Sequence, residues 1–172
     1  TIIDPTLVVW EGSLTSDGSA ISPAYAPYAA ISPPAISRGW KIAGYPLFDG
    51  LTRDDFRASF AKMAGLIGRL HKAGVPIVAG TDGYGMELVR ELELYQQVGM
   101  TNAEAVQSAT IAPARLNGMA DRFGSIEPGK VASLILVEGD ASQDLGALRR
   151  VATVFLDGYR LDGGELRKAS GF

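Results

Sequence analysis

Cysteine is absent from this 172-residue chain, and histidine occurs once, as His71. Without cysteine there is no disulfide and no thiolate ligand, so a bound metal needs oxygen or imidazole ligands. No basic run is present and the formal net charge is −3, which argues against binding to a phosphate backbone or an anionic membrane surface. No apolar run approaches the roughly 20 residues of a membrane-spanning helix, and no signal-peptide pattern is visible. We therefore expect neither nucleic acid nor membrane as a partner, and a cytoplasmic location is favoured.

Hydrophobic residues make up 47% of the chain, enough to bury the core of one domain or slightly more. The run from Val75 to Ala79 is apolar without alternation, and a glycine-rich turn that carries Asp82 follows it. Such a run predicts a strand of a parallel sheet with helices on both faces. Asp82 would then lie at the carboxyl end of that strand, where α/β folds gather catalytic groups. The alternative is a plain turn, because Asp and Gly both favour turns.

A second buried strand is predicted over residues 6–10, after Pro5 interrupts the apolar start of the chain. Residues 11–50 follow as a long loop rich in Gly, Ser, Ala and Pro. Loops of this length are usually lids, binding loops or disordered segments, and the interleaved aromatic residues argue against simple disorder. A substrate-facing lid and a packed surface excursion are equal alternatives, and we expect this loop to be the segment most readily cleaved by proteases. Its aromatic residues are Tyr25, Tyr28, Trp40, Tyr45 and Phe48.

Four helices are predicted between residues 52 and 118. The clearest covers residues 52–73, with Thr52 as N-cap and an apolar stripe that is expected to face a sheet. His71 lies in its last turn, where a capping or surface role is more typical than a ligand role. The next helix, residues 86–98, places its acidic residues, including Glu87 and Glu91, mostly on the face away from its apolar side chains. Two short helices follow over residues 103–109 and 113–117.

The pattern changes to antiparallel β-structure near residue 120. Strands are predicted over residues 131–137 and 151–156, and Asp157-Gly158 is a strong hairpin signal that leads into a third strand. In the preceding turn, Glu127 and Lys130 are interpreted as solvated residues without a catalytic role. We therefore divide the chain into residues 1–119, an α/β part, and residues 120–172, a small β-module.

Five motifs now occur in a familiar order. They are GTD at a strand end, RELELYQQVGMT, EAVQSATIAPARLNG, GSIEPGKVASLILVEGD and VFLDGYRL. In this order the chain resembles the carboxyl-terminal part of the metal-dependent amidohydrolase superfamily, nearest to its imidazolonepropionase-like and prolidase-like branch. The resemblance implies an α/β fold: the last strands and helices of a (β/α)8 TIM barrel plus part of a small antiparallel β-sandwich. Residues 6–10 would be strand 7, residues 75–80 strand 8, and residues 131–161 part of the sandwich.

The resemblance also implies a chemistry. It makes Asp82 the catalytic general acid/base and a metal ligand in a hydrolase of amide or cyclic amide C–N bonds. The implied cofactor is one or two divalent ions, with zinc favoured, bound mostly by residues outside this chain. The implied substrate is a small molecule or is dipeptide-like, with Tyr84 and the loop of residues 11–50 as candidates for binding it.

The chain departs from the family pattern in one large respect. The histidines that the family carries on strands 1, 5 and 6, and its ligand on strand 4, have no counterpart here, and a full barrel needs about 250 residues. We therefore expect an upstream amino-terminal segment of the same enzyme to be a partner that carries them, and a homo-oligomer is left open. The alternative function is a non-catalytic α/β fragment or association module, inactive without that upstream partner.

Overall fold

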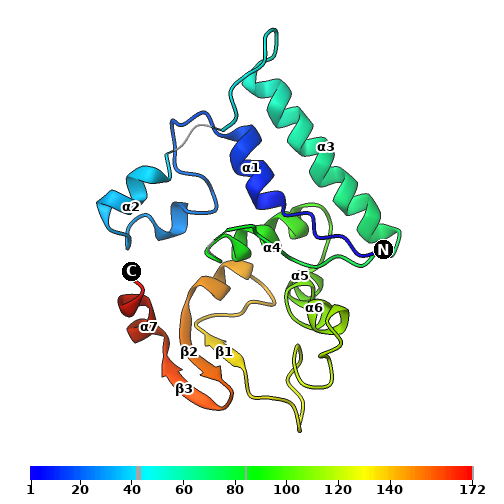
Figure 1. Ribbon diagram of the computed structural model, residues 1–172, viewed down its shortest axis with the longest axis vertical. Coiled ribbons are helices and arrows are strands. Elements are labelled where there is room, and N and C mark those ends of the chain that lie inside the picture. Colours follow the sequence, from blue (N-terminus) through cyan, green and yellow to red (C-terminus); the bar gives the residue numbers. More distant parts are fainter. Residues whose placement is uncertain (42–43, 84, 172) are drawn as a thin grey trace.

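The computed structural model describes residues 1–41, 44–83 and 85–171. Figure 1 shows helix α4, Leu88–Gln97, between the amino-terminal helices and the carboxyl-terminal sheet. It contacts helices on both sides, and Tyr95 at its centre is fully buried. The chain is therefore organised around α4, because its side chains join the hydrophobic core from several directions.

The expected parallel pairing between the two early apolar runs exists only as one bridge, between Ile3 and Ile77. The Ile3 N–H donates to the Pro76 carbonyl at 3.0 Å, and the Val78 N–H donates to the Ile3 carbonyl at 2.9 Å. Both runs therefore lie side by side and point the same way. Neither continues as a regular strand among the described residues.

The strand predicted over residues 6–10 is wrong, because helix α1 covers Leu7–Thr15. Thr6 has a φ of +48° and turns the chain out of the extended path. The N–H groups of Leu7 and Val8 then donate to the carboxylate of Glu91, at 2.9 and 2.6 Å. A short apolar run is compatible with a buried strand and with a buried helix. Here the distant Glu91 carboxylate accepts the first N–H groups of the helix and so favours the helix.

The segment predicted as a loop over residues 11–50 contains structure of its own. It begins inside α1 and includes the 3-10 helix η1, Ala26–Tyr28, and helix α2, Pro34–Gly39. The rings of Tyr25 and Trp40 stack at a centroid distance of 5.2 Å and an interplanar angle of 9°. This stack joins two parts of the segment, and the order it contains agrees with the expectation that it is not simply disordered, but its regular elements were not predicted.

Helix α3, Arg53–Lys72, confirms the clearest sequence prediction, and the Thr52 hydroxyl accepts the Asp55 N–H in a complete capping box. Its buried side chains pack against α1 and α4, so the expectation that its apolar stripe faces a sheet is wrong. The following helices also form, as α5, Asn102–Ser108, and α6, Ile111–Leu116. The capping box at Thr101 identified α5, whereas Pro113 in the first turn and Asn117-Gly118 at the end identified α6.

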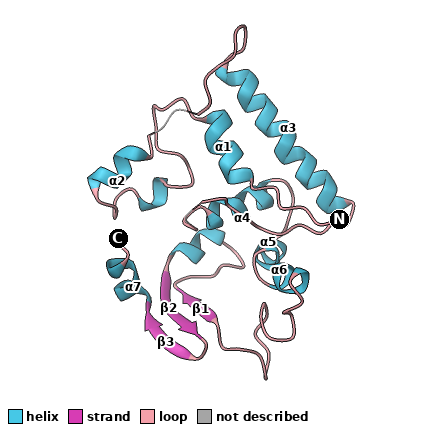
Figure 2. Ribbon diagram, viewed as in Figure 1, coloured by secondary structure: helices cyan, strands magenta, loops and turns pink. Residues whose placement is uncertain are grey.

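The carboxyl-terminal part is an antiparallel sheet in the order β1-β2-β3 (Figure 2). At the predicted hairpin, Asp157 and Gly158 have φ values of +51° and +86°, as a type I′ turn requires. The 3-10 helix η2 between β1 and β2 buries Leu145 and packs against α4. Helix α7 closes the chain and was not predicted. The bounds are β1 Leu134–Val137, η2 Leu145–Arg149, β2 Val151–Leu156, β3 Tyr159–Asp162 and α7 Gly163–Ala169.

Candidate active-site cleft

Asp82 lies at the mouth of a cleft of about 400 Å³. It is exposed and has a φ of +48°, a left-handed conformation that Asp tolerates better than most residues. Four groups of residues form the walls: one face of α1, the segment before η1, residues 44–46, and the turn that carries Asp82 together with Glu87. The lining residues are Val8, Val9, Gly12, Ser13, Ser22, Ala24, Tyr25, Gly44, Tyr45, Pro46, Thr81, Asp82, Gly83 and Glu87. Residues of the 11–50 segment therefore face Asp82 across one cavity.

Glu87 is a second carboxylate in this cleft, and only 4% of the residue is exposed. The Tyr25 hydroxyl donates to its Oε1 atom, while Oε2 is buried and has no hydrogen-bond partner among the described residues. A Cβ atom on Gly83 would lie 2.5 Å from Glu87 Oε1, so glycine at this position lets the Asp82 turn rest on the carboxylate. The prediction that Glu87 lies on the solvent face is wrong, because the cleft turns that face inward.

Glu91, one helical turn further on, is fully buried and holds the start of α1. Burial raises the pKa of its carboxyl group, although the N–H groups of Leu7 and Val8 act in the opposite direction. Burial also raises the pKa of the neighbouring Tyr95, whose hydroxyl donates to the Val78 carbonyl at 3.2 Å. Glu91 was predicted on the solvent face, and this is wrong. The signal that was missed is its spacing of four residues from Tyr95, which places both on one stripe.

A chain of ion pairs joins the elements behind the cleft. Arg90 binds the buried Glu11 with two hydrogen bonds, 2.9 Å from Nε and 2.6 Å from Nη2, and lies 3.3 Å from Glu93. Glu93 in turn accepts from Arg149 at 2.5 Å. Burial alone would raise the pKa of Glu93, but Arg149 and Arg90 hold it below its usual value. These ion pairs connect α1, α4 and η2.

Asp4 is a further carboxylate near the same end of the Ile3–Ile77 bridge, and sequence reasoning missed it. It is exposed, and it accepts the Thr6 hydroxyl at 3.1 Å. A Cβ atom on Gly80 would lie 2.3 Å from its Oδ2 atom, so Asp4 sits directly against the segment that leads to Asp82. Its position after a short apolar run, like that of Asp82, is the signal that could have identified it.

The described side chains of the cleft supply one candidate metal ligand, Asp82, and not a complete metal site. Among residues 1–41, 44–83 and 85–171, no group of three or more His, Asp or Glu side chains is placed to hold a metal ion. His71 pairs with Glu104 at 3.6 Å, at the far end of α3, and does not line the cleft. The exposed carboxylate of Asp82 is a suitable oxygen ligand for a divalent cation. Tyr84, predicted as a substrate contact, lies outside the described residues.

The other residues singled out from the sequence lie away from the cleft. Glu127 is exposed and pairs with Lys130 at 3.2 Å. The Lys130 ammonium also donates to the Ser125 hydroxyl, and its side chain is only 12% exposed, so the description of Lys130 as solvated is wrong. None of the described helices combines the length and apolar character that crossing a bilayer requires.

This chain is similar in sequence to one protein family and to individual curated proteins. A sequence model described as the amidohydrolase family matches residues 60–161. The chain is 41% identical over 75 residues to imidazolonepropionase from Geobacillus kaustophilus (strain HTA426), covering 40% of this chain and 18% of the relative. It is 33% identical over 88 residues to 5-methylthioadenosine/S-adenosylhomocysteine deaminase from Symbiobacterium thermophilum, covering 43% of this chain and 20% of the relative.

The fold of this chain is also similar to that of solved structures. A Xaa-Pro dipeptidase with methionine bound in its active site superposes with a TM-score of 0.65 at 26% identity, over 95% of this chain and 35% of that chain. A putative prolidase from Bifidobacterium longum superposes with a TM-score of 0.56 at 31% identity, over 65% of this chain and 30% of that chain. This chain thus spans about a fifth of the curated relatives and about a third of these structures.

Proposed function

We propose a function from the premise that this chain belongs to the amidohydrolase family. It is the carboxyl-terminal part of a metal-dependent hydrolase of amide or cyclic amide C–N bonds, and Asp82 is its general acid/base and one of its metal ligands. The observation that carries this proposal is the position of Asp82, exposed at the mouth of a 400 Å³ cleft, just after the Ile3–Ile77 bridge. The substrate is a small molecule or is dipeptide-like, in keeping with the cleft volume.

The chemistry assigned to Asp82 is proton transfer. A divalent cation, with zinc favoured and one or two ions expected, supplies the positive charge that lowers the pKa of the attacking water when it is bound. The Asp82 carboxylate accepts a proton from that water and donates it to the leaving nitrogen, so the residue ends the cycle in its starting state. Asp82 lines the cleft from a turn of left-handed conformation, and the buried Glu87 carboxylate packs against the neighbouring Gly83 of this turn.

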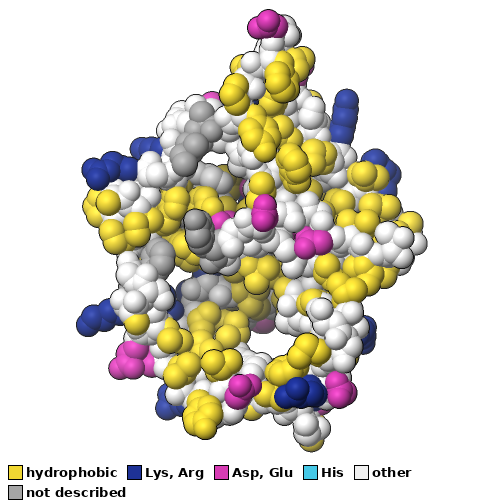
Figure 3. Space-filling view, viewed as in Figure 1, with side chains coloured by type: hydrophobic (Ala, Val, Ile, Leu, Met, Phe, Trp, Pro, Cys, Tyr) yellow, Lys and Arg dark blue, Asp and Glu magenta, His cyan; other side chains and the backbone are white. Residues whose placement is uncertain are grey.

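The remaining ligands are proposed to come from an upstream amino-terminal segment of the same enzyme. In this arrangement Ile3 and Ile77 mark strands 7 and 8 of a (β/α)8 barrel within residues 1–119, and residues 120–172 form part of a β-sandwich. The superposition on 35% of a Xaa-Pro dipeptidase supports this arrangement. Several large hydrophobic side chains are exposed, among them Phe48 and Ile126, and Figure 3 shows hydrophobic side chains in several separate groups on one face.

The test is Asp82→Asn in the complete protein, assayed on dipeptides and cyclic amides with added zinc. We expect turnover to fall by about 10² or more, since general acid/base catalysis is commonly worth 10² to 10⁴, with an unchanged melting temperature. Asp49→Asn is the matched control, because Asp49 is exposed and does not line the cleft. Near-normal turnover by Asp82→Asn would overturn the assignment.

A second candidate function is an association module without catalysis. The observation in its favour is the sheet, which leaves large apolar side chains exposed, among them Ile135, Leu136, Leu156 and Tyr159. The two functions differ in one measurement: the upstream polypeptide, added to residues 1–172, restores zinc binding and hydrolysis if the chain is part of an enzyme. Association with that polypeptide without any hydrolysis would favour the module.

A further inference from the structure

We propose that the Asp82 cleft binds an uncharged, apolar side chain of the substrate, and that Gly12 leaves the room for that side chain. This inference rests on the proposed function, because it names the class of amide substrate that the cleft would accept. Helix α1 lines the cleft with Val8, Val9, Gly12 and Ser13. Residues four apart lie one above the other on a helix, so these four residues form one face of α1.

Gly12 is a gap in this face. A Cβ atom built on Gly12 meets no neighbouring segment or side chain within 4 Å, whereas at Gly68 of α3 it would lie 2.4 Å from the Val98 carbonyl oxygen. Packing therefore requires glycine at Gly68 but not at Gly12, although glycine inside a helix is less favourable than alanine. A helical Cα–Cβ bond is tilted toward the start of the helix, so a side chain at position 12 would extend over Val8 and Val9. The glycine thus leaves open space above an apolar turn of α1.

Residues 44–46 form a wall beside α1, and their contacts hold this wall in place. The Tyr45 N–H donates to the Ser13 carbonyl at 2.7 Å, and Arg53 donates from Nη2 to the Tyr45 carbonyl at 2.9 Å. A Cβ atom on Gly44 would lie 2.2 Å from the Ser13 carbonyl oxygen, so this close approach requires glycine. The wall is therefore in place before a ligand binds, which reduces the cost of ordering it on binding.

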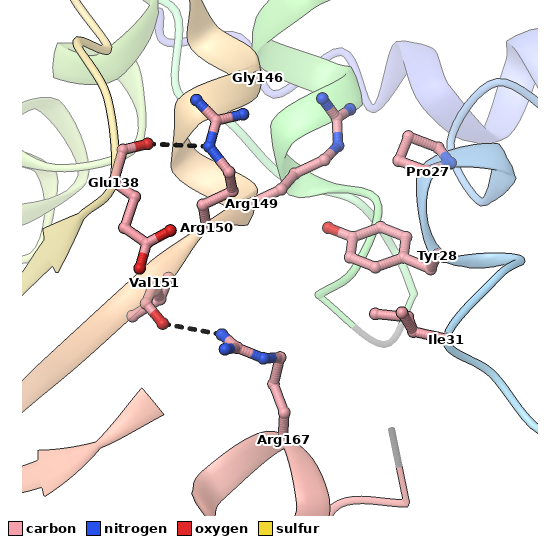
Figure 4. A pocket seen from close by; sticks show the side chains of 9 residues that line it. All are labelled: Pro27, Tyr28, Ile31, Glu138, Gly146, Arg149, Arg150, Val151 and Arg167. Carbon is pink, nitrogen blue, oxygen red and sulfur yellow. Dashed lines mark hydrogen bonds between the residues drawn. The ribbon is translucent and has the colours of Figure 1, made fainter. Parts of the chain in front are cut away.

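The charges of the cleft favour an uncharged group. Asp82 and Glu87 are the only charged residues among the described residues that line it, and none of those lining residues is basic. Arg149, Arg150 and Arg167 line a separate pocket of about 470 Å³, shown in Figure 4. A carboxylate on the substrate side chain would meet two carboxyl groups and no cationic side chain, so its loss of hydration would not be compensated. We therefore expect the cleft to accept aliphatic side chains and to reject acidic ones.

The first test compares ligands that differ only in their side chain. The N-acetyl α-amides of leucine, alanine and aspartate share an uncharged backbone, and calorimetric titration of the complete protein measures their affinity without turnover. We expect saturable 1:1 binding of the leucine derivative, about tenfold or more tighter than the alanine derivative, as added methylene groups give in an apolar pocket. The aspartate derivative should bind more weakly than both. The proposal is overturned if the leucine derivative does not bind saturably, or if the aspartate derivative binds equally tightly.

The second test fills the gap at Gly12. Gly12→Leu should weaken binding of the leucine derivative about tenfold or more, and Gly12→Ala, which adds a residue that helices favour, should weaken it less. Gly65→Leu is the matched control and should leave the affinity unchanged. Gly65 is also a half-buried glycine inside a helix, its Cβ would make an ordinary contact of 3.7 Å with Arg69 Nη1, and it does not line the cleft. Thermal unfolding checks that each variant folds, and an unchanged affinity in the folded Gly12 variants would overturn the role of Gly12.

These outcomes are distinct from those that test the proposed function. Binding of the leucine derivative that depends on Gly12, together with normal turnover by Asp82→Asn, would retain the subsite and remove the catalytic role of Asp82. Loss of turnover in Asp82→Asn, together with equal affinity for the leucine and aspartate derivatives, would retain that catalytic role and overturn the subsite.

Discussion

Helix α1 begins in a different way from helices α3 and α5. Helix α1 begins on the carboxylate of Glu91, which lies 84 and 83 residues further along the chain from the two N–H groups it accepts. Helices α3 and α5 begin on capping boxes closed within four residues, by Thr52 and by Thr101. The first kind of cap is buried and ties two distant segments together, whereas the second is exposed and forms wherever its own short sequence becomes helical.

This difference separates the regions by how they depend on the rest of the fold. The cleft that contains Asp82 has α1 as one wall, so the candidate site exists only when α4 delivers Glu91 to the start of α1. Helix α3 needs no such partner to begin. The candidate catalytic cleft therefore depends on a long-range, buried contact, whereas the start of α3 depends only on its own residues.

The largest effect is expected for Glu91→Ala. It leaves the buried N–H groups of Leu7 and Val8 without an acceptor, and each loss costs about 1–3 kcal/mol. We expect the free energy of unfolding to fall by about 3 kcal/mol and the amide protons of α1 to exchange faster with solvent. Gln97→Ala, an exposed position on the same helix, is the control and should change little. Unchanged protection of α1 in Glu91→Ala would contradict the role of this cap.

A smaller effect is expected when the local caps are removed. Thr52→Ala and Thr101→Ala each delete a side-chain acceptor for one N–H group, which typically costs about 1 kcal/mol. Denaturant unfolding should show the two losses adding, since the caps lie on separate helices. Hydrogen exchange of α1 should stay unchanged in both variants. A loss as large as that of Glu91→Ala would erase the distinction between local and long-range caps.

The smallest effect is a pH dependence that belongs to Glu91 alone. The pKa of Glu91 is raised in the folded protein from an ordinary value of 4.5. The protonated carboxyl group therefore stabilises the folded state below that pH, and this contribution is lost as the pH rises through the raised pKa. The stability difference between the unmodified protein and Glu91→Gln should therefore narrow as the pH increases from about 4.5. The other carboxylates are common to both proteins and cancel in this difference. A gap that widens with pH would mean that the folded protein favours the ionised form of Glu91.

The two carboxylates at the cleft show how far sequence reasoning reached. Asp82 was identified because an apolar run, a turn and a helix follow one another locally, and the structure places it at a cavity. Glu87 was missed because an acidic residue next to an apolar stripe usually faces solvent. Only the approach of Tyr25 and of the Asp82 turn shows that this face is covered.

The sequence by itself determined those features whose causes lie within a few residues. The capping box at Thr52 produced α3, and Asp157-Gly158 produced the hairpin between β2 and β3, because a cap or a turn requires only its own neighbours. Tertiary structure alone decided that residues 7–15 form a helix and that Glu87 and Glu91 are buried. In each case the deciding hydrogen bond or cover comes from a residue distant in the chain, and no local pattern contains it.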